Sequence, residues 1–358
     1  MSSSLIVPIV ELENVREHPN ADSLELADIL GYQIVIPKGK FKSGDQGVYF
    51  PADTVIPEEL AEKLNVTNYL KGKDVKRISK ISLRGEPSFG LFIEIPDHGK
   101  DWEVGQNVAE EFGASKYIPP INPHTSEEIA KYNPDIDPYF EVYTDIENGR
   151  IFTNIFNENE EIVITEKIHG TNSRIGIIGN KVVAGSHRTR KKWPVNSEGH
   201  EIFFQDMGNS IYWFPFIDEQ VVFLLNHLSE RFERIIIYGE IFGKGIQSKT
   251  YGLNNSKDYR IFDIKCNGKY LDFEELEKLC SDFKVNLVPV LYKGIFDLEV
   301  IKKYAEHNSV ISKSVETSEG VVVKPVKERI DPKIGRVILK YISNNFSLKN
   351  KDQDFTDV

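Results

Sequence analysis

The segment Ile164–Gly176 reads ITEKIHGTNSRIG and joins two strand-like pieces through a Lys-Ile-His-Gly-Thr-Asn sequence. The pieces on either side, EIVITEK and SRIGIIGNKVVAGSHR, are rich in β-branched residues and bounded by turn residues, which predicts strands. Gly170 would let the chain turn sharply and a ligand approach the backbone. Taken alone, Lys167 is read most simply as an ordinary charge at the end of a strand. Whether Lys167 has a chemical function must therefore be judged from the rest of the chain.

The sequence around this segment predicts a mixed α+β domain. The Gly-Asn pair at 179–180 lies between two apolar runs and is typical of a tight hairpin, so the strands on either side should be antiparallel neighbours. Residues 218–232, 272–283 and 298–308 have helical spacing of apolar residues. We expect antiparallel sheets with helices rather than a parallel sheet.

The first third of the chain has a different pattern. Apolar pieces at 24–30, 32–37, 47–51 and 90–96 are separated by Gly, Pro, Asn and Asp turns, which predicts a small antiparallel barrel. Residues 119–148 carry five prolines and few apolar clusters, as expected of a linker. We therefore predict a barrel domain at 1–118, a linker at 119–148 and a second domain at 149–358.

Composition limits the class of protein. A chain of 358 residues suits two domains. It has no apolar run near the roughly 18 residues that a membrane helix needs. The N-terminus lacks the basic region and cleavage site of a secretory signal, so we expect a cytoplasmic protein with no membrane partner. The spacing of Cys266 and Cys280 fits neither a redox pair nor a zinc site.

Net charge argues against indiscriminate binding to nucleic acid, because the chain carries −11 overall. A local basic region exists nonetheless. From 167 to 192 no acidic residue occurs, and the basic residues are Lys167, Arg174, Lys181, Arg188, Arg190, Lys191 and Lys192. Any contact with nucleic acid should be local, although a solvated basic loop is an equal alternative. In the first domain, Lys71, Lys73, Lys76, Arg77, Lys80 and Arg84 form a second basic run that could track a phosphate backbone.

Common nucleotide motifs are absent. GEIFGK at 239–244 has three residues between its glycines rather than four, and Gly245 follows the lysine, so it is not a phosphate loop of the Walker type. No GxGxxG occurs, which removes support for a dinucleotide-binding fold.

Charged residues instead recur where the strands of the second domain end. Glu240 follows RIIIYG, Glu319 opens EGVVVKP, Lys324 lies near its end and Lys340 ends GRVILK, while Phe262 lies within RIFDIK. Each alone could be a solubilising charge, an exposed turn or a core aromatic. All of them together predict a pocket in which lysines, an arginine and glutamates converge.

This set of motifs resembles the covalent nucleotidyltransferases. Lys-x-x-Gly at 167–170, Ser-His-Arg at 186–188, YGEIFG, RIFDIK, EGVVVK at 319–324 and VILK ending at Lys340 are similar, in order, to motifs I, Ia, III, IIIa, IV and V of that superfamily of ATP-dependent DNA ligases, RNA ligases and capping enzymes. EKIHGTN is most similar to the RNA ligase form, because DNA ligases and many capping enzymes more often have Asp at the position of His169.

The first domain narrows the resemblance. VREHPNADSLELADI is similar to the start of tRNA-binding OB domains, and the domain as a whole resembles the N-terminal OB module of the RNA ligase branch often called family 5. DNA ligases and capping enzymes carry an OB domain after the catalytic one. Since 18 residues follow Lys340, we expect no such domain and no motif VI. One departure is that many RNA ligases have Lys-x-Lys in motif V, whereas Ile342 stands here at the second position.

The resemblance implies a fold, an activity and a site. The fold is α+β, an OB-type β-barrel followed by a nucleotidyltransferase domain with an ATP-grasp-like arrangement of antiparallel sheets and helices. The activity is ATP-dependent polynucleotide RNA ligation: Lys167 takes AMP from ATP, passes it to a 5′-phosphate, and a 3′-hydroxyl then displaces AMP. The implied substrate is a nucleic acid break, RNA at least on the 3′-hydroxyl side, sealed by a monomer in RNA repair.

The resemblance also assigns roles to individual residues. Phe262 should stack on adenine, Glu240 should bind the ribose hydroxyls, Glu166 should read the adenine edge, and Glu319 should hold Mg²⁺ or Mn²⁺, in part through water. Residues that complete the nucleotide site are Ile168, Asn172, Arg188, Lys324 and Lys340. His169 and Gly170 belong to the phosphate-binding turn, where His169 either contacts phosphate or only supports the turn.

The chemistry asks for an unprotonated lysine. A free lysine has a pKa of about 10.4, so well under about 1% is amine at neutral pH. Lys324, Lys340 and a metal ion would disfavour the ammonium form of Lys167. Two alternatives stay open from sequence: a DNA ligase or capping-type enzyme, and a non-catalytic RNA-binding protein in which the OB domain does the binding.

Overall fold

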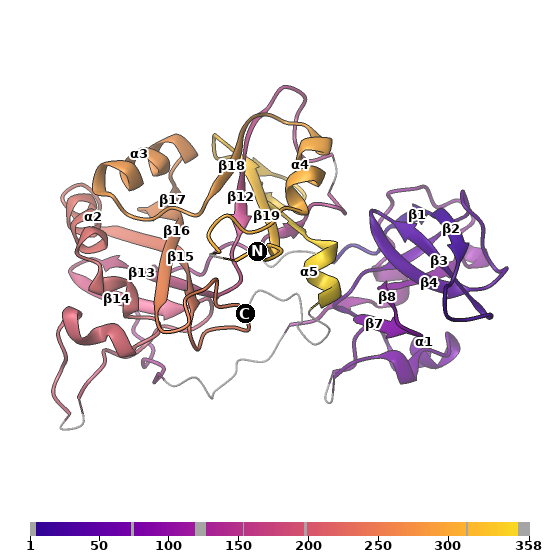
Figure 1. The fold of residues 1–358 in the computed structure, drawn as a ribbon, viewed down its shortest axis with the longest axis horizontal. Helices are drawn as coiled ribbons and strands as arrows, with labels where there is room; N and C mark the ends of the chain where they lie inside the picture. The colour runs from indigo at the N-terminus through magenta and orange to yellow at the C-terminus, as the bar shows by residue number, and fades with distance from the viewer. Residues whose placement is uncertain are drawn as a thin grey trace. The chain divides into compact units, whose positions relative to one another are not determined.

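The chain folds into two units, each with its own sheets (Figure 1). The computed structural model describes residues 5–72, 75–118, 127–152, 154–196, 199–312 and 314–349. Of these, unit 1 comprises the residues up to 118 with 148–152 and 347–349, and unit 2 comprises 127–147 and 154–346.

Unit 1 is built from short antiparallel strands. They pair as β1-β5-β9, β2-β3-β4, β6-β10 and β7-β8. The elements are β1 Ile9–Glu11, β2 Glu13–Glu17, β3 Leu24–Ile29, β4 Tyr32–Pro37, β5 Gln46–Phe50, β6 Thr54–Val55, α1 Glu58–Lys63, β7 Lys80–Leu83, β8 Glu86–Phe89, β9 Leu91–Glu94 and β10 Ser115–Lys116, with single 3₁₀ turns at Thr67–Tyr69, Asp97–Gly99 and Glu110–Phe112.

The strands of unit 1 enclose two apolar clusters. Ile9, Val48 and Phe50 belong to one, and Val10 and Tyr49 to the other. Because consecutive residues of β1 and of β5 point to opposite faces, both faces of these strands are buried, as in a small barrel. The strands predicted at 24–30, 32–37, 47–51 and 90–96 coincide with β3, β4, β5 and β9.

Part of the predicted basic surface of unit 1 is buried. Arg77 is 4% exposed, its Nε lies 2.9 Å from Asp53 Oδ1, and its guanidinium stacks 3.9 Å from the centre of the Tyr117 ring. Lys76 and Arg84 are exposed, whereas Lys73 lies outside the described residues. The expectation that Arg77 contacts a phosphate backbone is therefore wrong, because its charge is already paired inside the unit.

Unit 2 contains two five-stranded antiparallel sheets, ordered β11-β22-β19-β12-β18 and β14-β13-β15-β16-β17. The elements are β12 Glu161–Lys167, β13 Thr171–Ile178, β14 Lys181–Ser186, α2 Glu219–Ser229, β15 Arg234–Gly243, β16 Lys257–Cys266, β17 Lys269–Tyr270, α3 Phe273–Phe283, β18 Val290–Ile295, α4 Leu298–Ala305, β19 Gly320–Pro325, β20 Ile330–Asp331, β21 Gly335–Arg336 and β22 Leu339–Ile342, with 3₁₀ turns at Phe204–Asn209 and Phe214–Ile217. β11 Glu147–Asn148 and α5 Asn344–Lys349 lie at the division between the units.

Helices cover one face of each sheet of unit 2 (Figure 1). Leu224, Leu228 and Leu276 of α2 and α3 pack against Ile237 and Ile261 of β15 and β16. α4 packs on the other sheet, against β19 and β22. Asp218 caps α2 by accepting from the Gln220 amide at 2.9 Å, and Asp297 caps α4 by accepting from the Glu299 amide at 2.8 Å.

The predicted hairpin is present. β13 and β14 pair antiparallel from Ser173↔Ser186 to Ile178↔Lys181, and Gly179 at the turn has φ +62°. That left-handed backbone favours glycine. The hairpin places the Asn172 end of β13 beside the basic segment that follows β14.

The predicted linker contributes to the core of unit 2 in its described part. Ile136, Phe140 and Tyr143 are buried and pack with Tyr238 of β15. The carbonyl of Phe140 accepts a hydrogen bond from Arg174. The described part of this segment is therefore an irregular chain that packs on a sheet, which composition does not distinguish from a linker.

No helix among the described residues is long and apolar enough to cross a membrane.

Candidate active site

Lys167 is the last residue of β12 and lies opposite Gly320, the first residue of β19. Its Nζ is 2.8 Å from Glu319 Oε1, and the other oxygen of Glu319 is 3.1 Å from His169 Nδ1. The adjacent strands thus bring the beginning of EGVVVK to the end of EKIHG. One carboxylate joins the lysine to the histidine two residues further on.

This pairing fixes the charge of Glu319. Burial of the side chain opposes ionisation, but the positive charge of Lys167 and the hydrogen bond from His169 outweigh burial and hold the pKa of the Glu319 carboxyl below its usual value. Glu319 is therefore a carboxylate at neutral pH, and as such it stabilises the ammonium form of Lys167.

Three of the predicted lysines share one face of their sheet. In an antiparallel sheet, residues directly opposite each other lie on the same face, and alternate residues of a strand return to it. Val163 lies opposite Lys324, Thr165 opposite Val322, and Val322 opposite Lys340. Lys167, two residues beyond Thr165, therefore shares a face with Lys324 and Lys340.

The other sheet presents a polar row. Asn172 of β13 lies directly opposite Glu240 of β15, which lies opposite Arg260 of β16. Tyr238, two residues before Glu240, packs in a cluster that includes Val322 from the lysine face. The lysine face and the face with Asn172 and Glu240 are thus turned toward each other. Glu240 lies within β15 rather than at its end, where we expected it.

Phe262 lies at a β-bulge. Tyr238 pairs with Asp263 and Gly239 with Ile261, so Phe262 has no direct partner in β15. A bulge changes the direction of the extra side chain and is common beside active sites. The ring of Phe262 is partly buried, and Tyr143 contacts it edge-on at 4.8 Å between ring centres.

Several predicted residues carry buried polar atoms with no hydrogen-bond partner in the part of the chain that the structure describes. These atoms are Glu166 Oε1, His169 Nε2 and Asn172 Oδ1. Unpaired buried polar groups are uncommon and unfavourable in native proteins, so each such group calls for an explanation. A polar ligand beside Lys167 would supply the missing partners of His169 and Asn172.

Glu166 points away from Lys167, because consecutive residues of a strand face opposite sides. Its Oε2 accepts from the Val310 amide at 2.9 Å and lies 3.5 Å from His307 Nε2. The side chain is inaccessible to solvent. Its role in reading the adenine edge stays a prediction.

Lys324 is engaged elsewhere. Its Nζ forms ion pairs with Asp263 and, at 3.4 Å, with Glu328, and Lys324 is 4% exposed. Asp263 is also bound by Arg336 at 2.9 Å. Burial opposes ionisation of Asp263, but Arg336 and Lys324 outweigh it and lower the pKa of this carboxyl. Since its charge is balanced, Lys324 does not act in this structure as the unbalanced cation that we expected near Lys167.

The remaining predicted residues lie close to these strands. Arg188 follows β14 and is half-buried, and Lys340 is half-buried in β22. Ile168 is buried and packs with Phe242 and Tyr251.

Gly170 has a role that the turn alone does not explain. A Cβ at this position would lie 2.3 Å from the carbonyl oxygen of Ile241. Glycine is therefore required by the close approach of β15. Its backbone is not left-handed, unlike that of Gly179.

Tyr251 is a residue that the sequence did not single out. Its hydroxyl accepts a hydrogen bond from the His169 amide at 2.6 Å, and it is 1% exposed. Its φ of +53° is rare for a bulky side chain, and such strain is frequent at functional sites. Burial raises the pKa of the Tyr251 hydroxyl well above its usual value, and the hydrogen bond from His169 only partly opposes this. No local motif marks this position, because its partner is 82 residues away.

A divalent cation fits this site only in a water-bound form. Among the described residues, no three His, Cys, Asp or Glu side chains are grouped so as to hold a metal ion. Mg²⁺ keeps several waters and often takes one or two carboxylates from the protein. Glu319, a carboxylate beside Lys167, meets that requirement.

Comparison with known proteins decides the family. The family model described as RNA ligase matches residues 160–342, just over half of the chain, and the model of an OB-fold domain matches residues 6–95. The chain belongs to the RNA ligase family. The expected α+β class, with an N-terminal OB fold before the ligase domain, is thereby confirmed. No curated protein sequence matches the chain.

Solved structures of an RNA ligase from Naegleria gruberi share the fold. The structure with PPi has a TM-score of 0.68 at 24% identity and covers 97% of this chain and 99% of that one. A variant with AMP and Mn has a TM-score of 0.70 at 24% identity, again with 97% and 99% covered. A variant with ATP and Mn has a TM-score of 0.69 at 24% identity, with 98% and 100% covered. The two-unit architecture therefore recurs over the full length of those chains.

Proposed function

We propose that this RNA ligase uses ATP to join a 3′-hydroxyl and a 5′-phosphate in a polynucleotide, with Lys167 as the residue that carries AMP. The observation that carries the proposal is the facing pair of surfaces. Lys167 and Glu319 lie on one sheet, and Asn172 and Glu240 lie on the other, with Phe262 turned out by a bulge. Structures of the Naegleria enzyme, which has the same fold, contain ATP or AMP, which supports the use of ATP.

In the first step, Lys167 Nζ would attack the α-phosphorus of ATP, forming a P–N bond while the bond to pyrophosphate breaks. In the second step, an oxygen of the RNA 5′-phosphate would attack the same phosphorus and release the lysine. In the third step, the 3′-hydroxyl would attack the RNA phosphorus and AMP would leave. Each step is an in-line displacement, for which positioning and charge stabilisation supply most of the catalysis.

The residues of the two sheets suit separate parts of ATP. We assign adenine to Phe262, Ile168 and Glu166, the ribose hydroxyls to Glu240, and the phosphates to a further set. The residues assigned to the phosphates are Asn172, Arg188, Lys340 and the turn at His169 and Gly170. Lys324 would contact a phosphate only if its ion pairs rearrange. The unpaired atoms of Asn172 and His169 support this assignment, because a nucleotide offers both donors and acceptors.

Glu319 would hold the divalent cation through water. When bound, that cation supplies positive charge beside the phosphate oxygens. Lys167 must lose a proton to become a nucleophile, whereas its contact with Glu319 favours the charged form. Weakening of that contact is thus a requirement for the first step.

Labelled nucleotides test the proposal. Wild-type protein incubated with ATP labelled in the α-phosphate should retain label after denaturation, and Lys167→Ala should retain none. Labelled GTP should leave little label, which separates a ligase from a capping-type enzyme. Absence of label on the wild type would refute the proposal and favour a non-catalytic RNA-binding protein.

The sugar beside the break tests the substrate. We propose that the strand on the 3′-hydroxyl side is RNA, so nicks ending in ribose should be sealed faster than nicks ending in deoxyribose. Equal rates, or a preference for deoxyribose, would favour a DNA ligase.

We further propose that the enzyme acts as a monomer in the cytoplasm, where RNA and ATP occur together, in the repair of RNA. Light scattering should then give a mass near 40.9 kDa.

A further inference from the structure

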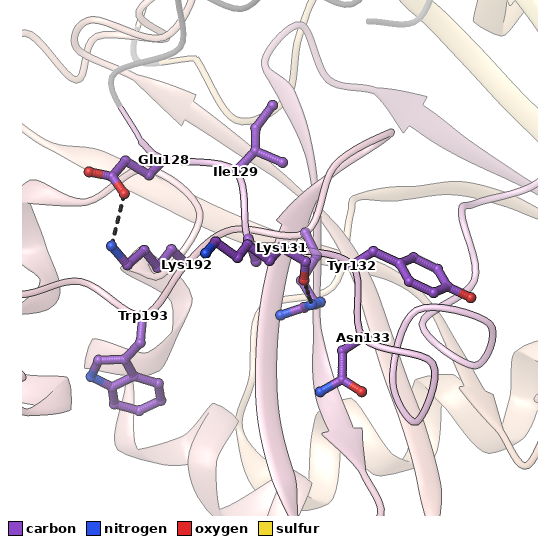
Figure 2. Close-up of a pocket in the computed structure, with 9 residues that line it drawn as sticks. Glu128, Ile129, Lys131, Tyr132, Asn133, Lys192 and Trp193 are labelled. Carbon is purple, nitrogen blue, oxygen red and sulfur yellow. Dashed lines mark hydrogen bonds and ion pairs between the residues drawn. The ribbon is translucent and has the colours of Figure 1, made fainter.

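Unit 2 has a groove of about 520 Å³ (Figure 2). We call it the basic groove. It is lined by residues 128–133 with Arg190, Lys192 and Trp193. Two of its cations, Arg190 and Lys192, belong to the basic segment that the sequence analysis singled out, and the proposed chemistry uses neither of them.

The base of the basic groove is a short antiparallel pairing. Ile129 lies opposite Lys191, the Ala130 amide donates to the Arg190 carbonyl at 2.9 Å, and the Lys192 amide donates to the Glu128 carbonyl at 2.9 Å. The Lys191 amide donates in turn to the Ala184 carbonyl of β14 at 2.8 Å. The groove is therefore an extension of a sheet rather than a gap between loops.

Arg190 serves the structure of the groove. Its Nε donates to Asp137 at 2.7 Å and its Nη2 donates to the Lys131 carbonyl at 2.6 Å. The hydrogen bond from Arg190 lowers the pKa of the Asp137 carboxyl. The charge of Arg190 is therefore balanced, and the guanidinium holds the two walls together.

The side chains offered to solvent include an aromatic ring and two lysines, together with Glu128, whose side chain is 77% exposed, and Ile129, which is 48% exposed. Tyr132 is 74% exposed, Lys131 is exposed, and the Lys192 side chain is 58% exposed. In Figure 2, Tyr132 and Trp193 lie at opposite ends of the groove with the lysines between them. Lys192 pairs with Glu128 at 2.9 Å, but both are exposed, and such surface pairs exchange readily for another anion.

One layer of buried side chains lies between the base of the basic groove and the candidate active site. The ammonium of Lys191 lies 4.9 Å from the centre of the Tyr212 ring. The Tyr212 hydroxyl lies 3.4 Å from the Thr171 hydroxyl, next to Gly170 in the turn after Lys167. These buried contacts place the base of the groove near the turn that follows Lys167.

Single-stranded nucleic acid is bound by cations that follow the phosphates and by aromatic rings on which bases stack. An acidic protein segment would need the lysines but not an exposed ring beside them. We propose that the basic groove holds the RNA substrate several nucleotides from the break, with phosphates on Lys131 and Lys192 and a base on Tyr132. This inference rests on the proposed function and adds a second contact region to it.

The test uses the full chain and exposed substitutions. Tyr132→Ala and Lys131→Ala are compared with Tyr139→Ala, an exposed tyrosine of the same segment outside the groove, and with Lys181→Ala on the exposed hairpin. Labelling of Lys167 by ATP without RNA should stay within twofold of wild type in all four. The KM for an RNA with a single-stranded segment next to the break should rise about tenfold in Tyr132→Ala and remain unchanged in the two controls.

Two further measurements, the salt dependence of RNA binding and its dependence on RNA length, test the groove more specifically. Lys131→Ala should reduce the slope of log Kd against log salt by about 0.7 to 0.9, the value for one phosphate contact. Trimming the RNA on one side of the break should abolish the difference between wild type and Tyr132→Ala, because a short strand does not reach the groove. Binding that is identical in wild type and groove variants at every length would overturn the inference.

Two other outcomes would also overturn it. One is a parallel loss of lysine labelling, which would mean damage to the active site. The other is displacement of RNA by polyglutamate with no effect of Tyr132→Ala, which would show a simple charge patch. Affinity for an RNA with a blocked 3′ end, measured without ATP, does not depend on catalysis, so a failure of the proposed function is distinguished from a failure of the groove.

Discussion

Lys167 has a carboxylate as its nearest charged neighbour. Glu319 bridges Lys167 and His169, and Tyr251 in turn holds the His169 amide. A lysine at the end of a strand becomes a candidate nucleophile here because three residues from three segments, Glu319, His169 and Tyr251, fix its surroundings. The sequence motifs identify Lys167, Glu319 and His169, but they do not show which of these side chains contact each other.

The contacts of Glu319 predict a pH dependence of stability. Its pKa is lowered on folding from an ordinary value of 4.5, so its contribution is complete above about pH 4.5 and is lost as the pH falls through the lower folded-state pKa. Glu319→Gln should thus destabilise the protein at pH 7 by about 1.5–3 kcal/mol, as for hydrogen bonds to charged groups. The difference from wild type should narrow in acid.

Urea unfolding at several pH values measures this difference. Glu299→Gln is a suitable control because Glu299 forms an exposed pair with Lys302. A Glu319→Gln difference that is as large at pH 3 as at pH 7 would contradict the prediction.

Tyr251→Phe should slow the labelling of Lys167 about three- to tenfold, as expected for loss of one hydrogen bond of about 0.5–1.5 kcal/mol. The KM for ATP should change little, because the hydroxyl acts on the His169 backbone. Tyr259→Phe is the matched control, since its buried hydroxyl has no hydrogen-bond partner among the described residues. Equal effects of the two substitutions on the rate of labelling would remove the role of Tyr251.

At the scale of elements, two features hold the site and neither is visible in a local pattern. One is the bulge in β16 that gives Phe262 its direction. The other is a buried network that joins β16, β19 and β21, in which Asp263 binds Lys324 and Arg336. Arg336 also contacts the Tyr143 hydroxyl at 3.0 Å, and Tyr143 packs on Phe262. The network therefore supports the ring proposed to bind adenine.

Removal of one member of this network should be strongly destabilising. Arg336→Met leaves Asp263 with less compensation in a buried place, and such losses amount to about 3–5 kcal/mol. Lys278→Met, which removes an exposed pair with Asp282, should change stability by less than about 0.5 kcal/mol. Urea unfolding measures both, and a loss below about 1 kcal/mol for Arg336→Met would show that the network is not what holds these strands.

The strands, the helices of unit 2 and the hairpin at 179–180 could be predicted because their signals are local. Periodicity and turn residues mark β12, β13, α2 and α3 without reference to distant parts of the chain. The pairing of Lys324 could not be predicted, because Asp263 lies 61 residues away and nothing in EGVVVKP shows which charge meets it. The prediction that Arg77 is a surface cation was wrong for the same reason, because its contacts with Asp53 and Tyr117 form only in the folded structure.

At the scale of the whole molecule, the two units differ in what they offer to RNA. Unit 2 carries the candidate active site and the basic groove. Unit 1 is an OB fold, a class that often binds nucleic acid strands, and it retains Lys76 and Arg84 as exposed cations.

Charge reversal in unit 1 tests whether unit 1 binds RNA while unit 2 carries out the labelling of Lys167. Lys76→Glu with Arg84→Glu should leave labelling of Lys167 by ATP unchanged and raise the KM for nicked RNA several-fold, more at low salt than at high salt. Lys63→Glu with Lys100→Glu reverses the same amount of charge at other exposed positions. Equal loss of labelling and sealing would contradict a docking role for unit 1.

The reactivity of the two buried cysteines can be used to measure unfolding of unit 2. Cys266 of β16 and Cys280 of α3 are free and buried in the same apolar cluster, and burial raises the pKa of each thiol to about 12. Thiols of this kind react slowly with alkylating reagents until the surrounding structure opens. Because the chain has no other cysteine, the rate of alkylation measures how often this core opens, and ATP should slow it if nucleotide binding stabilises the two sheets.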